Sequence, residues 1–103
     1  MENKQKREAE IRKMVQQLNE KARMLIESTQ SSSHLGMPLE QRVKRLEDLK
    51  FSAVGLLNET IQVLTEEGYE KNRELTSYCF QNMTAIEERL DSAIRAIKSN
   101  PNG

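Results

Sequence analysis

The pattern of hydrophobic and polar positions divides the chain into three amphipathic segments, of which the middle one, Leu39 to Leu64, is the most apolar. One stripe in it steps by three or four residues, as one face of a helix does: Leu39, Val43, Leu46, Leu49, Ala53, Leu57, Thr60 and Leu64. Further apolar residues flank this stripe on both sides: Phe51, Val54 and Ile61 on one, and Leu56 and Val63 on the other. A helix with so wide an apolar surface must be covered from more than one direction, so we expect the other two segments to pack against it.

The first and third segments each carry a narrower helical stripe. In the first, the repeat predicts a helix over about residues 5–29: Ile11, Val15, Leu18, Ala22, Leu25 or Ile26, and Thr29. In the third, a coiled-coil-like seam predicts a helix over about residues 70–98: Leu75, Cys79, Met83, Ile86, Leu90, Ala93 and Ile97. Residues 1–8 contain almost nothing apolar and are expected to fray, and residues 99–103 are expected to form a disordered tail.

Two breaks separate the three predicted helices. The first, Ser28 to Met37, contains three consecutive serines, and Pro38 after it suits the first turn of a helix over about residues 38–66. The second is Gly68, within a stretch where the apolar stripe is interrupted, and this favours a tight reversal that ends the helix. The alternative is one continuous helix over 38–98 that tolerates a glycine at about 1 kcal/mol.

These elements predict an all-α fold, an elongated antiparallel three-helix bundle with coiled-coil-like packing, formed by residues 1–103 as a single domain. The composition agrees, since 31% of the residues are charged, only 4% are aromatic and there is no tryptophan. In architecture this pattern resembles spectrin-type repeats and other three-helix adaptor modules. Fold class alone does not assign a function.

The overall charge draws the chain to no particular partner, because 16 Lys and Arg residues balance 16 Asp and Glu residues. The single cysteine excludes an internal disulfide. The amino-terminal stretch lacks the apolar run of a signal peptide, and no window is apolar enough for a membrane span. We therefore expect a soluble, intracellular, cytoplasmic protein.

Residues capable of catalysis or metal binding are scattered. His34 lies in the serine-rich loop and Cys79 in the middle of the third stripe, so neither has a ligand or base beside it. The paired carboxylates Glu66-Glu67 and Glu87-Glu88 have the pattern of a solvated helix face. No nucleotide-binding or zinc motif occurs. We therefore expect no enzymatic activity, no cofactor, no metal site and no small-molecule substrate.

Apolar residues outside the core stripes are the candidate partner-binding surface: Phe51, Val54, Leu56, Ile61, Val63, Tyr78 and Phe80. They either cover neighbouring helices within the bundle or form an exposed patch for another chain, and the sequence leaves both open. The leading functional hypothesis is a non-catalytic helical protein–protein interaction module, a scaffold or subunit of a larger helical assembly. Self-association is one form of it.

A basic cluster in the first helix supports an alternative, a peripheral membrane-surface or nucleic-acid binder. Its candidate anionic contacts are Lys4, Lys6, Arg7, Arg12 and Lys13. Glu8 and Glu10 are interleaved with them, and the stacking aromatics of nucleic-acid binders are missing. These features disfavour a nucleic-acid partner, and we expect a weak membrane contact at most.

Overall fold

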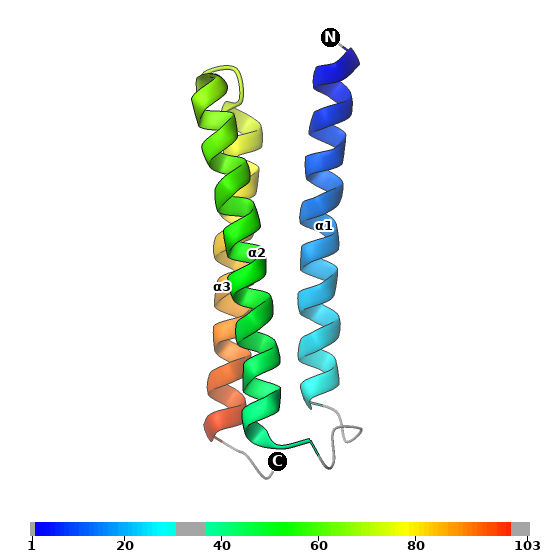
Figure 1. Cartoon of the computed structure of the whole chain (residues 1–103), viewed down its shortest axis with the longest axis vertical. Coiled ribbons are helices and arrows are strands. Elements are labelled where there is room, and N and C mark those ends of the chain that lie inside the picture. Colours follow the sequence, from blue (N-terminus) through cyan, green and yellow to red (C-terminus); the bar gives the residue numbers. More distant parts are fainter. Residues whose placement is uncertain (1, 31–36, 100–103) are drawn as a thin grey trace.

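The described part of the chain forms three long antiparallel helices. The computed structural model describes the backbone of residues 2–30 and 37–99 and the side chains of residues 5–29 and 37–99. This part consists of α1 (Glu2–Gln30), α2 (Leu39–Gly68) and α3 (Arg73–Ser99). The helices alternate in direction along a molecule that measures 53 × 20 × 15 Å (Figure 1). The predicted elongated three-helix bundle is thus confirmed.

The helix boundaries lie within a few residues of the predicted ones. The backbone of α1 is already helical at Glu2. The fraying expected for residues 1–8 stays a prediction. Pro38 directly precedes α2, where its carbonyl accepts hydrogen bonds from the N–H groups of Gln41 and Arg42 at 3.1 and 3.2 Å. Residues 31–36 of the predicted loop, His34 among them, and residues 100–103 of the predicted tail lie outside the described residues.

The reversal between α2 and α3 is built on Gly68 and Asn72. Gly68 has a φ of 138°, a conformation that side chains with a Cβ rarely adopt, so α2 ends there and the continuous helix is excluded. The side-chain nitrogen of Asn72 donates to the Leu64 carbonyl at 3.0 Å, and the Asn72 carbonyl accepts the N–H of Thr76 at 2.8 Å. One asparagine therefore satisfies backbone groups at the end of α2 and at the start of α3.

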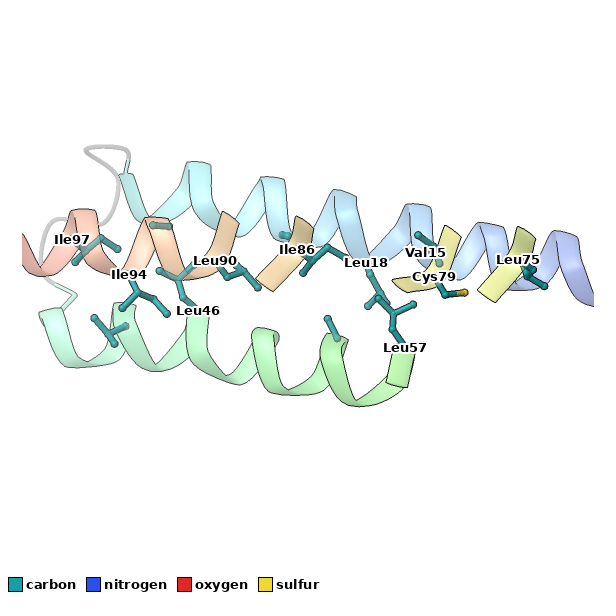
Figure 2. Close-up of a cluster of buried hydrophobic side chains, with 14 of the residues drawn as sticks. Val15, Leu18, Leu46, Leu57, Leu75, Cys79, Ile86, Leu90, Ile94 and Ile97 are labelled. Atoms are coloured by element: carbon teal, nitrogen blue, oxygen red, sulfur yellow. The ribbon is translucent and has the colours of Figure 1, made fainter. Parts of the chain in front are cut away.

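All three helices contribute to one hydrophobic core along the bundle axis (Figure 2). Its buried members come from the predicted stripes together with Ile94 of α3: Val15, Leu18 and Ala22; Val43, Leu46, Ala53, Leu57 and Leu64; Leu75, Cys79, Ile86, Leu90, Ala93, Ile94 and Ile97. The other apolar or threonine members of the stripes, apart from the buried Thr29, are only half-buried: Ile11, Leu25, Ile26, Leu39, Leu49, Thr60 and Met83. Both neighbours thus pack against the central stripe of α2, whereas Phe51, Leu56 and Val63 on its flanks stay exposed.

α2 and α3 form a close pair, and α1 packs along one side of it (Figure 1). Asn19 of α1 donates from its side-chain nitrogen to the Asn82 side-chain oxygen of α3 at 2.9 Å. Arg7 of α1 forms an ion pair with Glu67 of α2 at 2.6 Å. None of the helices within residues 2–30 and 37–99 combines the length and the apolar character that crossing a membrane requires.

Candidate interaction surface

The side of the α2–α3 pair that faces away from α1 carries one stripe of residues from each helix. On α2 the stripe follows spacings of four and three residues: Glu47, Phe51, Val54, Asn58 and Ile61. On α3 the same spacings connect a second stripe: Phe80, Thr84, Glu87 and Asp91. Residues at these spacings share one face of a helix. We call the two stripes together the α2–α3 face.

Contacts between the helices fix the orientation of this face. Lys50 Nζ of α2 donates to Asp91 Oδ1 of α3 at 2.8 Å, which joins the edges of the two stripes. α1 contacts α3 on the opposite flank, where Arg12 lies 4.6 Å from the centre of the Tyr78 ring and Asn19 pairs with Asn82. Because Tyr78 and Phe80 are two residues apart on a helix, they point in nearly opposite directions. Phe80 is therefore on the side away from α1.

Two phenylalanines on the α2–α3 face are open to solvent. Phe51 is 73% exposed and Phe80 is 57% exposed, whereas Val54 and Ile61 of the same face are half-buried. The Lys50–Asp91 pair sets the antiparallel register, which brings Phe80 level with Ile61. Phe51 and Phe80 thus lie about 15 Å apart along the bundle, given a rise of 1.5 Å per residue.

Charged side chains gather around Lys50, the residue before Phe51. The pKa of Lys50 is raised above its ordinary value, first by its hydrogen bond to Asp91 and also by the nearby charges of Glu87 and Glu47. Lys50 Nζ also lies 5.8 Å from the centre of the Phe51 ring. This end of the α2–α3 face therefore combines an exposed aromatic ring with charges of both signs, since the exposed Lys44 continues the α2 stripe three residues before Glu47.

The other predicted partner-binding residues lie elsewhere. Leu56 and Val63, 41% and 46% exposed, share the opposite flank of α2. Val63 there lines a shallow groove of about 360 Å³ beside Ile11 and Met14 of α1. Tyr78 is half-buried beneath Arg12. The structure thus divides the predicted set among three places and brings only Phe51, Val54, Ile61 and Phe80 together.

The predicted basic residues do not form one patch within the described side chains. Arg7 pairs with Glu67, and Arg12 pairs with Glu8 at 3.1 Å. Lys6 and Lys13 are exposed on the outer side of α1, and the side chain of Lys4 lies outside the described residues. The anionic contact stays a prediction.

Cys79 is fully buried, as its place in the seam suggests. Burial raises the pKa of its thiol, and the charge of Arg12 opposes that shift in part. The sequence did not connect these residues, which are 67 positions apart and meet only because α1 packs on α3. Since the thiolate is the reactive form of cysteine, this setting favours an inert side chain.

Two further features were not singled out by the hydrophobic pattern. Met24, on the outer side of α1, is 57% exposed. At the end of the bundle that carries the α2–α3 reversal, charged and polar side chains line a hollow of about 1070 Å³: Arg7, Glu8, Glu67, Glu70, Lys71, Asn72, Arg73 and Glu74, with Leu64 and Leu75. Within the described part of the chain, no three His, Cys, Asp or Glu residues are grouped so that they could hold a metal ion.

Comparisons of the chain with models of protein families, with curated proteins and with solved structures give no match.

Proposed function

We propose that this chain is a non-catalytic helical module that binds another protein through the α2–α3 face, as a scaffold or as one subunit of a larger helical assembly. The observation that carries the proposal is the exposure of Phe51 and Phe80 on one face, 73% and 57%, beside the half-buried Val54 and Ile61. Exposed aromatic side chains grouped with aliphatic ones are typical of protein-binding surfaces, where they supply most of the binding energy.

The arrangement of the face also supports a helical partner. The two stripes run along antiparallel helices, so the surface between them is long and narrow. An amphipathic helix that lies along such a surface presents apolar residues at matching spacings. A fourth helix on this side would complete a four-helix arrangement around α2 and α3.

The test is capture of a partner from the cell of origin, followed by reconstitution from purified components. We expect Phe80→Asp to abolish the complex in sedimentation, because an unpaired charge would be buried in the interface. Met24→Asp is the matched control, since Met24 is also 57% exposed but lies on the outer side of α1. Circular dichroism should show that both variants remain folded. Equal loss of binding in the two variants, or a folded chain that forms no complex, would contradict the proposal.

A further inference from the structure

The structure shows which segment covers the side of the α2–α3 pair opposite the α2–α3 face. α1 lies along that side and places three buried apolar residues against it: Val15, Leu18 and Ala22. We call this side the α1 groove and define it by Glu67 of α2 and by Tyr78, Cys79 and Asn82 of α3. The chemistry of a helix that fills the groove follows from the contacts that α1 makes there.

Three polar contacts select the helix in the α1 groove. They follow one another along α1: Arg7 with Glu67 at 2.6 Å, Arg12 at 4.6 Å from the centre of the Tyr78 ring, and Asn19 with Asn82 at 2.9 Å. From residue 7 to residue 19 they span about 18 Å of helix, given a rise of 1.5 Å per residue. A helix that makes all three contacts needs two arginines and an asparagine at these spacings, next to an apolar stripe. α1 itself meets this requirement.

α1 is held less firmly than the two helices that it covers. It packs less extensively against them than they pack against each other, and it contributes fewer of the described buried core residues than either of them. When α1 separates, apolar core side chains of α2 and α3 meet water, and the Asn82 side-chain oxygen loses the donor that Asn19 supplies. An open copy therefore has both an uncovered groove and an unpaired helix that fits it.

We infer that α1 is an exchangeable helix, and that in a dimer of this chain α1 of each copy occupies the α1 groove of the other. An exchanged α1 restores the contacts of the closed chain, which makes the exchange of an identical element a low-cost route to a dimer. A helix of unrelated sequence would have to match Glu67, Tyr78 and Asn82 at once. The inference goes beyond the proposed function, since it uses the opposite side of the α2–α3 pair and leaves both α2–α3 faces of the dimer free.

Concentration determines whether the closed chain or the dimer forms. Both contain the same contacts, so an exchanged α1 competes with the helix attached through residues 31–38. The effective concentration of a helix on such a short connection is on the order of 1 mM. We therefore expect a monomer at micromolar concentrations and a dimer as the chain approaches about 1 mM. Sedimentation over that range measures the change in mass from one copy to two.

A pair of complementary variants tests the exchange directly. The first, Glu67→Arg/Asn82→Leu, changes the α1 groove. The second, Arg7→Glu/Asn19→Leu, changes α1. Each variant alone places like charges opposite each other and leaves one amide without its partner on the other helix.

The mismatch disappears when the two variants exchange α1. The unchanged α1 of the first variant then meets the unchanged groove of the second, and the two altered surfaces match each other in charge and in apolar character. We expect the mixture to form a heterodimer with a Kd about a hundredfold below that of the wild-type dimer, because each matched groove contributes about tenfold. Sedimentation of the mixture and of each variant alone measures the difference.

Two controls separate exchange from other association. Combining all four substitutions in one chain restores the match within that chain, so this variant should remain a monomer where the mixture dimerises. Adding Phe51→Asp/Phe80→Asp to both members of the pair should leave the heterodimer intact, since the α2–α3 face takes no part. Circular dichroism should show that each variant alone is helical. If one is not, the wild-type concentration series decides instead, and a monomer at every concentration overturns the exchange.

Three results from helical variants would overturn the exchange. One is a mixture that stays monomeric. Another is a single variant that self-associates as strongly as the mixture, because association would then not depend on the match between α1 and the groove. Neither affects the proposed function, which is tested separately by partner binding to Phe80→Asp. The third is a heterodimer that Phe51→Asp/Phe80→Asp dissociates, which would assign the association to the α2–α3 face.

Discussion

Two glycines of α2 illustrate how the same residue type has opposite roles at different positions. Gly55 lies on the exposed side of the middle of the helix, and a Cβ placed there meets nothing within 4 Å. Gly68 ends the helix with a φ of 138°, and a Cβ there meets only Lys71 side-chain carbons at 3.7 and 3.8 Å. Space is available at both positions, so backbone conformation alone distinguishes them.

We therefore predict that Gly55→Ala stabilises the fold and Gly68→Ala destabilises it. Alanine at Gly55 should raise the free energy of unfolding by about 0.5–1 kcal/mol, because it reduces the conformational entropy of the unfolded chain. Alanine at Gly68 should lower it by about 1–3 kcal/mol, because the left-handed conformation is strained for any residue with a Cβ. Urea titration of both variants measures the two changes. A gain of stability at Gly68 would show that α2 can continue past its observed end.

At the level of the elements, a pair of asparagines fixes the position of α1 on α3. Asn19 Nδ2 donates to the Asn82 side-chain oxygen at 2.9 Å and to the Val15 carbonyl at 3.1 Å. Asn82 Nδ2 in turn donates to the Tyr78 carbonyl at 2.8 Å. Both side chains are half-buried. A polar pair between helices specifies their relative register more than their stability, because any shift along the axis breaks the hydrogen bond between Asn19 and Asn82.

This role predicts non-additive effects of substitution. Asn82→Leu alone should lower the free energy of unfolding by about 1 kcal/mol, since the Asn19 amide loses its acceptor on α3. Adding Asn19→Leu should restore most of that loss, because two apolar side chains can pack where the amides met. The exposed Asn58 supplies the control, and Asn58→Leu should change stability by less than about 0.5 kcal/mol. Denaturation of the single and double variants gives the coupling energy, and strictly additive losses would exclude the pairing.

The sequence predicted the three helices, but only some of the contacts that end them. The spacing of the core residues gave each helix to within a few positions, because burial imposes a period of 3.6 residues on every helix that packs on one side. The interruption of the stripe around Gly68 indicated the reversal. Asn72 was missed, since its side chain serves the Leu64 carbonyl eight residues away. That contact exists only once the chain has turned.

At the level of the whole molecule, the sequence predicted that α2 needs two neighbours but not which side each one takes. The flank with Phe51 and the flank with Val63 are both apolar, so α1 could have covered either. The structure places α1 beside the Val63 flank, where Arg7 meets Glu67, and leaves Phe51 exposed. Which flank of α2 stays exposed thus depends on the handedness of the bundle, and the hydrophobic stripe of a single helix does not predict that handedness.

We expect α1 to detach from the bundle before α2 and α3 separate. α1 packs less extensively against α2 and α3 than these two pack against each other. Cys79 is fully buried, and Arg12 of α1 lies close enough to influence its pKa. Release of α1 should therefore expose Cys79 while α2 and α3 remain paired. The opening that lets a thiol reagent label Cys79 should then cost less free energy than global unfolding.

Two core variants distinguish this partial opening from global unfolding. Val15→Ala weakens α1 at a buried position and should speed the labelling of Cys79 about tenfold, since loss of two buried methyl groups costs roughly 1–2 kcal/mol. Ile94→Val lies in the buried part of α3, fifteen residues from Cys79, and should lower global stability by about 1 kcal/mol with little effect on labelling. Labelling measured against urea concentration separates the two routes, because partial opening exposes less surface and depends less on urea. If both variants speed labelling in proportion to their loss of global stability, Cys79 becomes accessible only through complete unfolding, and α1 is as firmly held as the helices it covers.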